Sequence, residues 1–244
     1  MDIICKNCGD VITKNYCANC GDNDSVRRID RNYAVQEVLY LIGFEKGFLY
    51  TAKLLLLKPG LLLRTYIHES RQKITKPITF LVITSVIYTV ISKFFGTDKI
   101  ASDFSAKAYG DSSLTSINIW IQENMGYANI LMIMPITFWA RIFFKKYGYN
   151  FYETFLVISF VMGFGMLIFS LEPPIANLFP SKILVTNSLL AFLAFIYAGW
   201  AIGQFYGKTI KNYFKAFLSY IFGFITFQIV VTIIAVVNNM ILKK

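Results

Sequence analysis

Residues 78–95 read ITFLVITSVIYTVISKFF and carry one charged side chain, Lys93, near their end. The hydrocarbon core of a bilayer is about 30 Å thick, and an α-helix of roughly 20 apolar residues can cross it. This run therefore predicts a transmembrane helix. Four further apolar runs of similar length lie at residues 127–144, 153–171, 183–206 and 214–241. Together they predict an all-α integral membrane helical bundle of about five transmembrane helices, which occupies residues 77–244.

The composition agrees with a membrane protein. Of the 244 residues, 56% are hydrophobic and 16% are charged, whereas a soluble domain has about 25% charged residues. Residues 1–20 contain no apolar core of the length that a cleavable signal peptide needs. We therefore expect the first span to act as the insertion signal.

The lysines and arginines predict the orientation of the spans. The formal net charge is +10. Twelve of the cations precede the first span: Lys6, Lys14, Arg27, Arg28, Arg31, Lys46, Lys53, Lys58, Arg64, Arg71, Lys73 and Lys76. Because basic segments stay inside and bind anionic lipid headgroups, we expect a multi-pass protein of the inner (cytoplasmic) membrane, with the N-terminus in the cytoplasm and the C-terminus outside. Nucleic-acid binding is the alternative, and it is disfavoured because these cations flank membrane segments.

All four cysteines lie near the N-terminus, as Cys5-Lys-Asn-Cys8 and Cys17-Ala-Asn-Cys20, and each pair is followed by a glycine. Two C-x-x-C pairs separated by a short loop are typical of a zinc site with four thiolate ligands. Such a site is closed to water, so one structural Zn²⁺ is expected in a zinc ribbon or knuckle over residues 1–24. Two disulfides are the alternative, and they would need an oxidising compartment.

Residues 25–76 are expected to form basic amphipathic helices at the membrane surface. The stretch YAVQEVLYLIGFEKGFLYTAKLLLL (33–57) carries Glu45, Lys46 and Lys53, which makes it a poor span. We expect it to lie in the interface, with Pro59-Gly60 ending the helix. Its apolar side would hold Phe44, Phe48, Leu49, Leu55 and Leu56. Thr75 is expected to cap the first span, with Pro77 in its first turn.

Two stretches resemble each other: FFKKYGYNFYETFLVISF (143–160) and FYGKTIKNYFKAFLSYIF (205–222). They suggest two copies of one helical hairpin, in which Asn150 and Asn212 would be N-caps. The alternative is that the two stretches are not a repeat. Cations, aromatic residues and a capping Asn are each common in a loop on the inner side of a membrane. Gly199, Gly203 and Gly207 form two overlapping G-x-x-x-G units, which predict close helix packing, within the monomer rather than between monomers.

The spans contain few groups that could do chemistry. Ionisable residues in mid-membrane mark proton relays and ion pathways, but Glu153, Glu172 and Arg141 are placed at span ends. The mid-span polar residues are neutral: Thr84, Ser85, Thr137, Ser159, Asn187, Ser188, Thr226 and Gln228. We therefore expect no enzyme and nominate no catalytic residue; His68, which lies outside the spans, is assigned no role.

The chain resembles a bacterial membrane-protein family that joins an N-terminal double-CxxC zinc ribbon to a multi-span domain of unknown function. The resemblance rests on CKNCGDVITKNYCANCGD (5–22), EKGFLYTAKLLLLKPGLLLRTYI (45–67) and RQKITKPITFLVI (71–83). The positions that match recurring family elements are Lys46, Gly47, Phe48, Thr51, Pro59, Gly60, Arg64, Tyr66, Ile67, Lys76 and Pro77. Where the family commonly has E-G-K-R, this chain reads His68-Glu69-Ser70-Arg71. The resemblance implies an architecture and no activity.

These patterns lead to two expectations of function. The first is a non-enzymatic membrane protein whose zinc ribbon and basic helices form a cytoplasmic docking or regulatory face for a protein partner. The second is a small-solute transporter or channel built from the two repeated hairpins. The oligomeric state is left open by the sequence.

Overall fold

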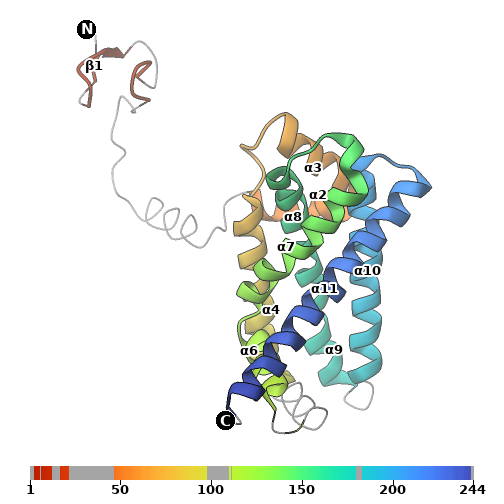
Figure 1. The fold of residues 1–244 in the computed structure, drawn as a ribbon. Helices are drawn as coiled ribbons and strands as arrows, with labels where there is room; N and C mark the ends of the chain where they lie inside the picture. The colour runs from red at the N-terminus through yellow and green to blue at the C-terminus, as the bar shows by residue number, and fades with distance from the viewer. Residues whose placement is uncertain are drawn as a thin grey trace. The chain divides into compact units, whose positions relative to one another are not determined.

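A computed structural model describes residues 3–5, 7–12, 17–21, 47–97, 110, 112–179 and 183–242 of the chain. The chain divides into two compact units, 1–42 and 43–244. Figure 1 shows the ribbon of both units.

The second unit is helical throughout its described part and contains five long apolar helices. These are α4 (Pro77–Phe95), α7 (Met125–Phe144), α8 (Phe151–Phe169), α10 (Ile183–Tyr206) and α11 (Ile210–Leu242). All five are long and apolar enough to cross a membrane. The predicted spans are thereby confirmed as helices, and they indicate a multi-pass membrane protein.

Shorter helices connect the long ones. They are α2 (Gly47–Leu57), α3 (Pro59–His68), α6 (Ser113–Glu123), the 3-10 turn η1 (Lys145–Tyr147) and α9 (Glu172–Leu178). Helix α8 ends at Phe169, and the Glu172-Pro173-Pro174 segment follows after two residues. It begins α9, because proline is tolerated in the first turn of a helix, where its missing N–H is not needed.

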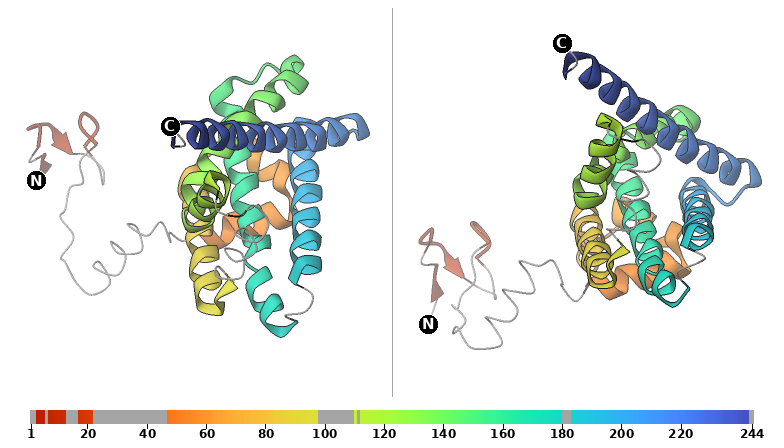
Figure 2. Two further views of the ribbon diagram at one scale, coloured as in Figure 1. Left: turned by 60° about the horizontal axis from the view of Figure 1, so that its bottom comes forward. Right: turned by 90° about the horizontal axis from the view of Figure 1, so that it is seen from below.

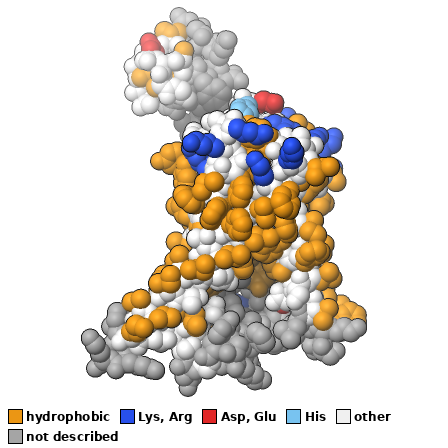
Figure 3. Space-filling model, turned by 45° about the vertical axis from the view of Figure 1, so that its right-hand side comes forward, with side chains coloured by type: hydrophobic (Ala, Val, Ile, Leu, Met, Phe, Trp, Pro, Cys, Tyr) orange, Lys and Arg blue, Asp and Glu red, His pale blue; other side chains and the backbone are white. Residues whose placement is uncertain are grey.

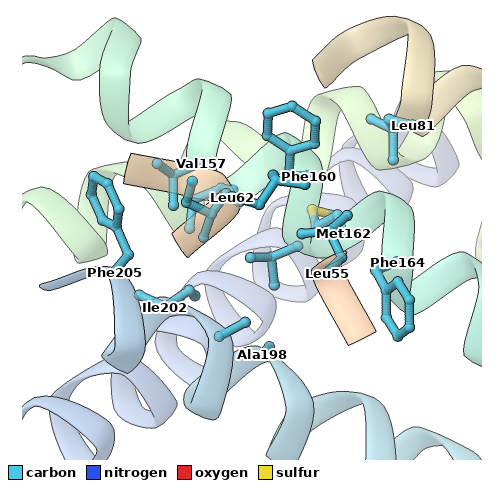
Figure 4. Packing of buried hydrophobic residues seen from close by; sticks show 14 of the residues in the cluster. Leu55, Leu62, Leu81, Val157, Phe160, Met162, Phe164, Ala198, Ile202 and Phe205 are labelled. Atoms are coloured by element: carbon cyan, nitrogen blue, oxygen red, sulfur yellow. The ribbon is translucent and has the colours of Figure 1, made fainter. Parts of the chain in front are cut away.

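Helix α8 forms the centre of the bundle. It packs against α4, α7 and α10 as well as α2 and α3, and 67% of its apolar stretch is buried, against 22% for α11. Figure 4 shows Val157, Phe160 and Met162 of α8 meeting Leu62 of α3 and Ile202 of α10. These five helices therefore share α8 as their core surface, while α11 packs on α7 and α10.

The α2–α3 pair is part of the bundle core. Phe48 and Leu55 are buried, and Leu62 and Leu63 of α3 are fully buried. The carbonyl of Leu55, in the last turn of α2, accepts a hydrogen bond from the Tyr197 hydroxyl at 3.1 Å. This contact satisfies a carbonyl that the helix itself leaves without a partner.

The break between α2 and α3 at Pro59 is confirmed. Of the residues predicted for the apolar side, Phe48 and Leu55 are buried in the bundle, whereas Leu49 is 71% exposed and Leu56 is 56% exposed. Tertiary packing divides the helix into two apolar faces, one facing the bundle and one facing outward. The rest of the predicted 33–57 helix, which includes Phe44, Glu45 and Lys46, lies outside the described residues, and the location at the membrane surface stays a prediction.

The segment before α4 differs from the prediction at one residue. Pro77 is in the first turn of α4, as predicted, but the N-cap position is Lys76, so the expectation for Thr75 is wrong. The Thr75 N–H donates to Thr51 Oγ1 of α2 at 3.0 Å. This buried hydrogen bond therefore ties α2 to the segment just before α4.

Two glycines of α10 bring α11 close to that helix. A Cβ at Gly199 would lie 3.1 Å from Phe217 Cβ, and one at Gly203 would lie 2.9 Å from Tyr213 Cα. The predicted close packing within the monomer is therefore confirmed for these two glycines. Gly207 has φ +114° and forms the turn between α10 and α11 instead. Figure 2 shows α11 running obliquely across the other long helices.

Asn150 and Asn212 have different roles. Asn150 caps α8: its side chain accepts from the Glu153 N–H at 2.9 Å, and Glu153 Oε2 accepts from the Asn150 N–H at 2.7 Å. Asn212 lies inside α11, which begins at Ile210, so the prediction of an N-cap at Asn212 is wrong. Its Nδ2 donates to the carbonyls of Tyr206 and Gly207 at 3.0 and 2.9 Å.

The asparagines of the two similar loops therefore have different roles in the structure. The end of α10 leaves carbonyls without helical partners, and α11 begins early enough to bring the Asn212 amide beneath them. The same Nδ2 donates to the Tyr147 hydroxyl of the other turn at 2.7 Å. Whether the 62-residue spacing is a true repeat stays a prediction.

Replacing Asn212 with alanine should lower the free energy of unfolding by about 1–3 kcal/mol, because buried carbonyls lose their donor. Asn212→Asp, which keeps the shape without the Nδ2 donor, should do the same. The exposed neighbour Lys211 provides the control, and Lys211→Ala should stay within about 0.5 kcal/mol. The measurement is unfolding by SDS titration in detergent micelles; an Asn212→Ala protein as stable as the control would contradict this role.

Candidate functional site

The four cysteines come together in the first unit. Strands β1 (Ile3–Ile4) and β2 (Val11–Ile12) pair antiparallel, and Cys5 follows β1 directly. The Cys5 N–H donates to the carbonyl of Asp10 at 2.8 Å, and the Gly9 N–H donates to the carbonyl of Cys5 at 2.9 Å. The chain thus turns tightly within the first C-x-x-C pair and its following glycine.

The second pair repeats this turn. The Gly21 N–H donates to the carbonyl of Cys17 at 2.9 Å, as that of Gly9 does to Cys5. Gly9 and Gly21 have φ of 79° and 74°, a conformation that glycine adopts without a steric penalty. A glycine therefore suits the turn that follows each C-x-x-C pair.

The sulfur positions suit a tetrahedral metal ion. All four Sγ atoms lie within 4.8 Å of one another; Cys5 and Cys20 are 3.5 Å apart, and Cys8 and Cys17 are 3.4 Å apart. Four thiolates around zinc with bonds of about 2.3 Å would be separated by roughly 3.8 Å. A disulfide needs about 2.05 Å, so these distances are too long for that alternative.

Backbone groups favour the thiolate form of one ligand. The N–H groups of Cys20 and then of Asn19 lower the pKa of Cys17 to about 7. The thiolate is the form that binds metals. The cluster can therefore hold a metal ion, and its chemistry is that of a closed sulfur site.

A cavity of about 440 Å³ lies in the second unit. Its size is within the range of small-molecule sites. The lining residues are Tyr88, Thr89, Ser92, Lys93, Thr97, Asn118, Ile119, Ile121, Glu123, Ala128, Asn129, Met132, Met166, Phe169, Glu172, Asn187, Phe224, Phe227 and Gln228. They come from α4, α6, α7, α8, α9, α10 and α11, except Thr97, which follows α4.

The directions of the helices produce this cavity. Near the α10–α11 turn, Gly199 and Gly203 hold α11 against α10. At its other end α11 reaches α6, where the Ser113 hydroxyl donates to Asn239 Oδ1 at 2.6 Å. Because α11 leaves α10 in this way, Asn187 and Gln228 face a space between diverging helices. Figure 3 shows this face hollowed in the half of the bundle away from the basic residues.

Buried polar groups form part of the wall. Asn129 is 4% exposed, and its Nδ2 donates to Ser85 Oγ at 3.3 Å. Ser92 and Thr97 hydroxyls lie 3.0 Å apart. Glu172 is 8% exposed, and within the described part of the chain its carboxylate has no hydrogen bond or ion pair.

The sequence identified some of this cavity and missed the rest. Asn187 and Gln228 were singled out as mid-span polar residues, and both line it. Asn129 was missed, and Glu172 was interpreted as a residue of a span end. One signal was available: Glu172 is the only acidic residue after Glu153. Two other mid-span residues have partners on neighbouring helices: Ser85 Oγ accepts from Asn129 Nδ2 at 3.3 Å, and Thr226 Oγ1 accepts from Trp139 Nε1 at 3.0 Å.

These features define a multi-pass helical membrane protein with a four-cysteine cluster that can hold a metal ion. Residues 45–89 are similar to a family described as "Protein of unknown function (DUF3667)". No curated protein and no solved structure matches the chain.

The matched segment has a clear structural role. It covers α2, α3 and much of α4, and it includes Gly60 and Arg64. A Cβ at Gly60 would lie 2.7 Å from the carbonyl of Gln204. Arg64 Nη1 donates to the carbonyls of Gln204 and Phe205 at 2.7 and 3.2 Å, at the end of α10 where a cation is favoured by the helix dipole. The motif residues therefore join α3 to α10.

Proposed function

We propose that this protein is a non-enzymatic membrane protein with a zinc-stabilised docking domain in the cytoplasm. The observation that carries the proposal is the distribution of basic residues in the bundle. Among the described lysines and arginines, all but Lys93 lie on or beside the α2–α3 pair or at the α7–α8 and α10–α11 turns. They gather at one end of the apolar surface (Figure 3), and basic ends of membrane proteins face the cytoplasm.

The cysteine cluster supports the second half of the proposal. Helix α2, the first described helix of the second unit, begins at Gly47, which packs against the backbone of Lys73 and Thr75 near this basic end. A cytoplasmic location favours reduced thiols, and four thiolates favour zinc. A closed zinc site supplies structure and no open coordination position, which suits contact with a protein partner better than chemistry.

The test uses the full-length protein in intact cells. A tag at the N-terminus should become accessible to antibody only after permeabilisation, and a tag at the C-terminus should be accessible before it. A cytoplasmic protein should crosslink to the wild type and to Asn19→Ala, which keeps all four thiols, but not to Cys17→Ser. An exterior N-terminus, or equal crosslinking by all three proteins, would reject the proposal.

A transporter or channel is the second candidate, and the cavity favours it. Asn187 and Gln228, which are neutral and sit within α10 and α11, both line this space. If solutes pass through it, Asn187→Leu and Gln228→Leu should each reduce solute flux into proteoliposomes by about tenfold, since each removes a polar contact in an apolar setting. Ser188→Ala, beside Asn187 and outside the lining, is the matched control. Equal flux in all variants would reject this candidate.

A further inference from the structure

Glu172 is the most unusual residue of the cavity. It is 8% exposed and begins α9, which packs between α4 and α10. The N-cap position of α9 is Leu171, whose side chain makes no capping hydrogen bond, and Glu172 is the only acidic residue in the first turn of this helix. The Glu172 carboxylate oxygens are not among the fully buried polar atoms that lack a partner, so the carboxylate opens into the cavity that it lines. An ionised carboxylate in so buried a residue is costly without a counter-charge, and a cation in the cavity would supply one.

The charged residues of the described lining leave a net negative charge. They are the two carboxylates of Glu123 and Glu172 and the ammonium group of Lys93. Lys93 and Glu123 are exposed, so water already solvates them, and Lys93 makes no ion pair with Glu172. A monovalent cation would therefore balance the lining, with the buried carboxylate as its counter-ion.

The remaining lining indicates what kind of cation fits. A metal ion would need several converging oxygen ligands, and a cavity of about 440 Å³ is far larger than a bare ion. Tyr88, Phe169, Phe224 and Phe227 also line it. Aromatic rings attract ammonium groups through their faces and contact alkyl groups as well.

We propose that this cavity is a binding site for a small organic cation, whose ammonium group pairs with the Glu172 carboxylate against the aromatic wall. The amides of Asn129, Asn187 and Gln228 would contact the polar remainder of the ligand. The site is independent of the docking role. It rests on the transporter candidate only in naming the class of solute. The proposed site needs the cation to bind, and it does not need the protein to transport it.

The experiment measures binding to the full-length protein in a non-ionic maltoside detergent. The probes are choline and 2-phenylethylamine, each compared by titration calorimetry with its uncharged isostere, 3,3-dimethylbutan-1-ol and 2-phenylethanol. At least one cation should bind about tenfold or more tightly than its isostere, since only the cation satisfies the buried charge. Glu172→Gln should raise the Kd of that cation by about tenfold or more.

Matched variants separate the site from general effects of charge. Glu123→Gln, at the exposed carboxylate of the same lining, should change the Kd by less than about threefold, since an exposed pair contributes little. Without probe, Glu172→Gln should unfold at the same or a higher temperature than the wild type, because it removes a buried charge; a merely structural carboxylate would lower it.

Three results would overturn the proposal: no binding of either cation, equal binding of cation and isostere, or equal cation binding by wild type and Glu172→Gln. Binding of a cation without flux in proteoliposomes would uphold this site and reject only the transporter candidate.

Discussion

Cys17→Ser should abolish stoichiometric metal binding by the full-length protein and unfold its first unit. The wild type should carry about one zinc ion per chain, because four thiolates form one closed tetrahedral site. Cys17 is 3% exposed, and its Sγ lies 3.4 Å from that of Cys8. A serine hydroxyl there is a poor zinc ligand, so the site would keep only three thiolate ligands.

The effect should be large because metal binding and folding are one event in so small a unit. The described hairpin has two strands of two residues each, which bury too little apolar surface to fold alone. Structural zinc supplies about 10–16 kcal/mol in comparable peptides. Loss of the ion should therefore remove nearly all of the stability of the first unit.

Metal analysis by mass spectrometry and limited proteolysis provide the measurement. Zinc content should fall from about one ion per chain to near zero in Cys17→Ser, and cleavage within residues 1–42 should become rapid. Asn19→Ala should retain the ion. Residues 43–244 form a separate unit, so the bundle should resist cleavage in both variants. A zinc-loaded Cys17→Ser protein, or a wild type purified without metal, would contradict the assignment.

Gly223→Ala should be the most disruptive single-methyl change in the bundle. Gly223 of α11 lies against the backbone of α7, where an added Cβ would be 2.7 Å from Ile136 N and closer still to Ile136 Cα. Backbone atoms inside a helix cannot rotate away as a side chain can. The two helices must therefore separate, which overpacking data place at about 1–3 kcal/mol or more.

The chain offers a matched control in Gly165 of α8. A Cβ there would meet no atom within 4 Å, and alanine in a helix is favoured over glycine by about 0.5–1 kcal/mol. Gly165→Ala should therefore be neutral or stabilising, while Gly223→Ala should be strongly destabilising. SDS titration in detergent compares the two directly, and similar stabilities would refute the close approach of α11 to α7.

Local signals predicted the elements of this protein well. The five spans were found because each residue in hydrocarbon must be apolar, so a single stretch of sequence carries the whole signal. The cysteine pairs were found because their spacing is itself the geometry of the turn. Asn150 was correct as an N-cap because its partner, Glu153, is three residues away.

Predictions failed where the partner is distant in sequence. Lys215 follows Asn212 at the place where Glu153 follows Asn150, and the Asn212 amide donates to the Tyr147 hydroxyl, 65 residues away, as well as to the end of α10. Thr75 bonds Thr51, 24 residues away, rather than capping α4. Leu55 was assigned to an interfacial face, but Tyr197, 142 residues away, lies over its carbonyl. In each case a buried contact from another helix outweighed a local preference.

The spans, their apolar character and the sulfur cluster thus follow from residues close together in the chain, because desolvation and turn geometry act locally. The cavity and the burial of Glu172 follow only from the folded bundle. They depend on the angle at which α11 crosses its neighbours, and that angle is set by contacts at Gly199, Gly203 and Gly223 with residues that lie 10 to 87 positions away.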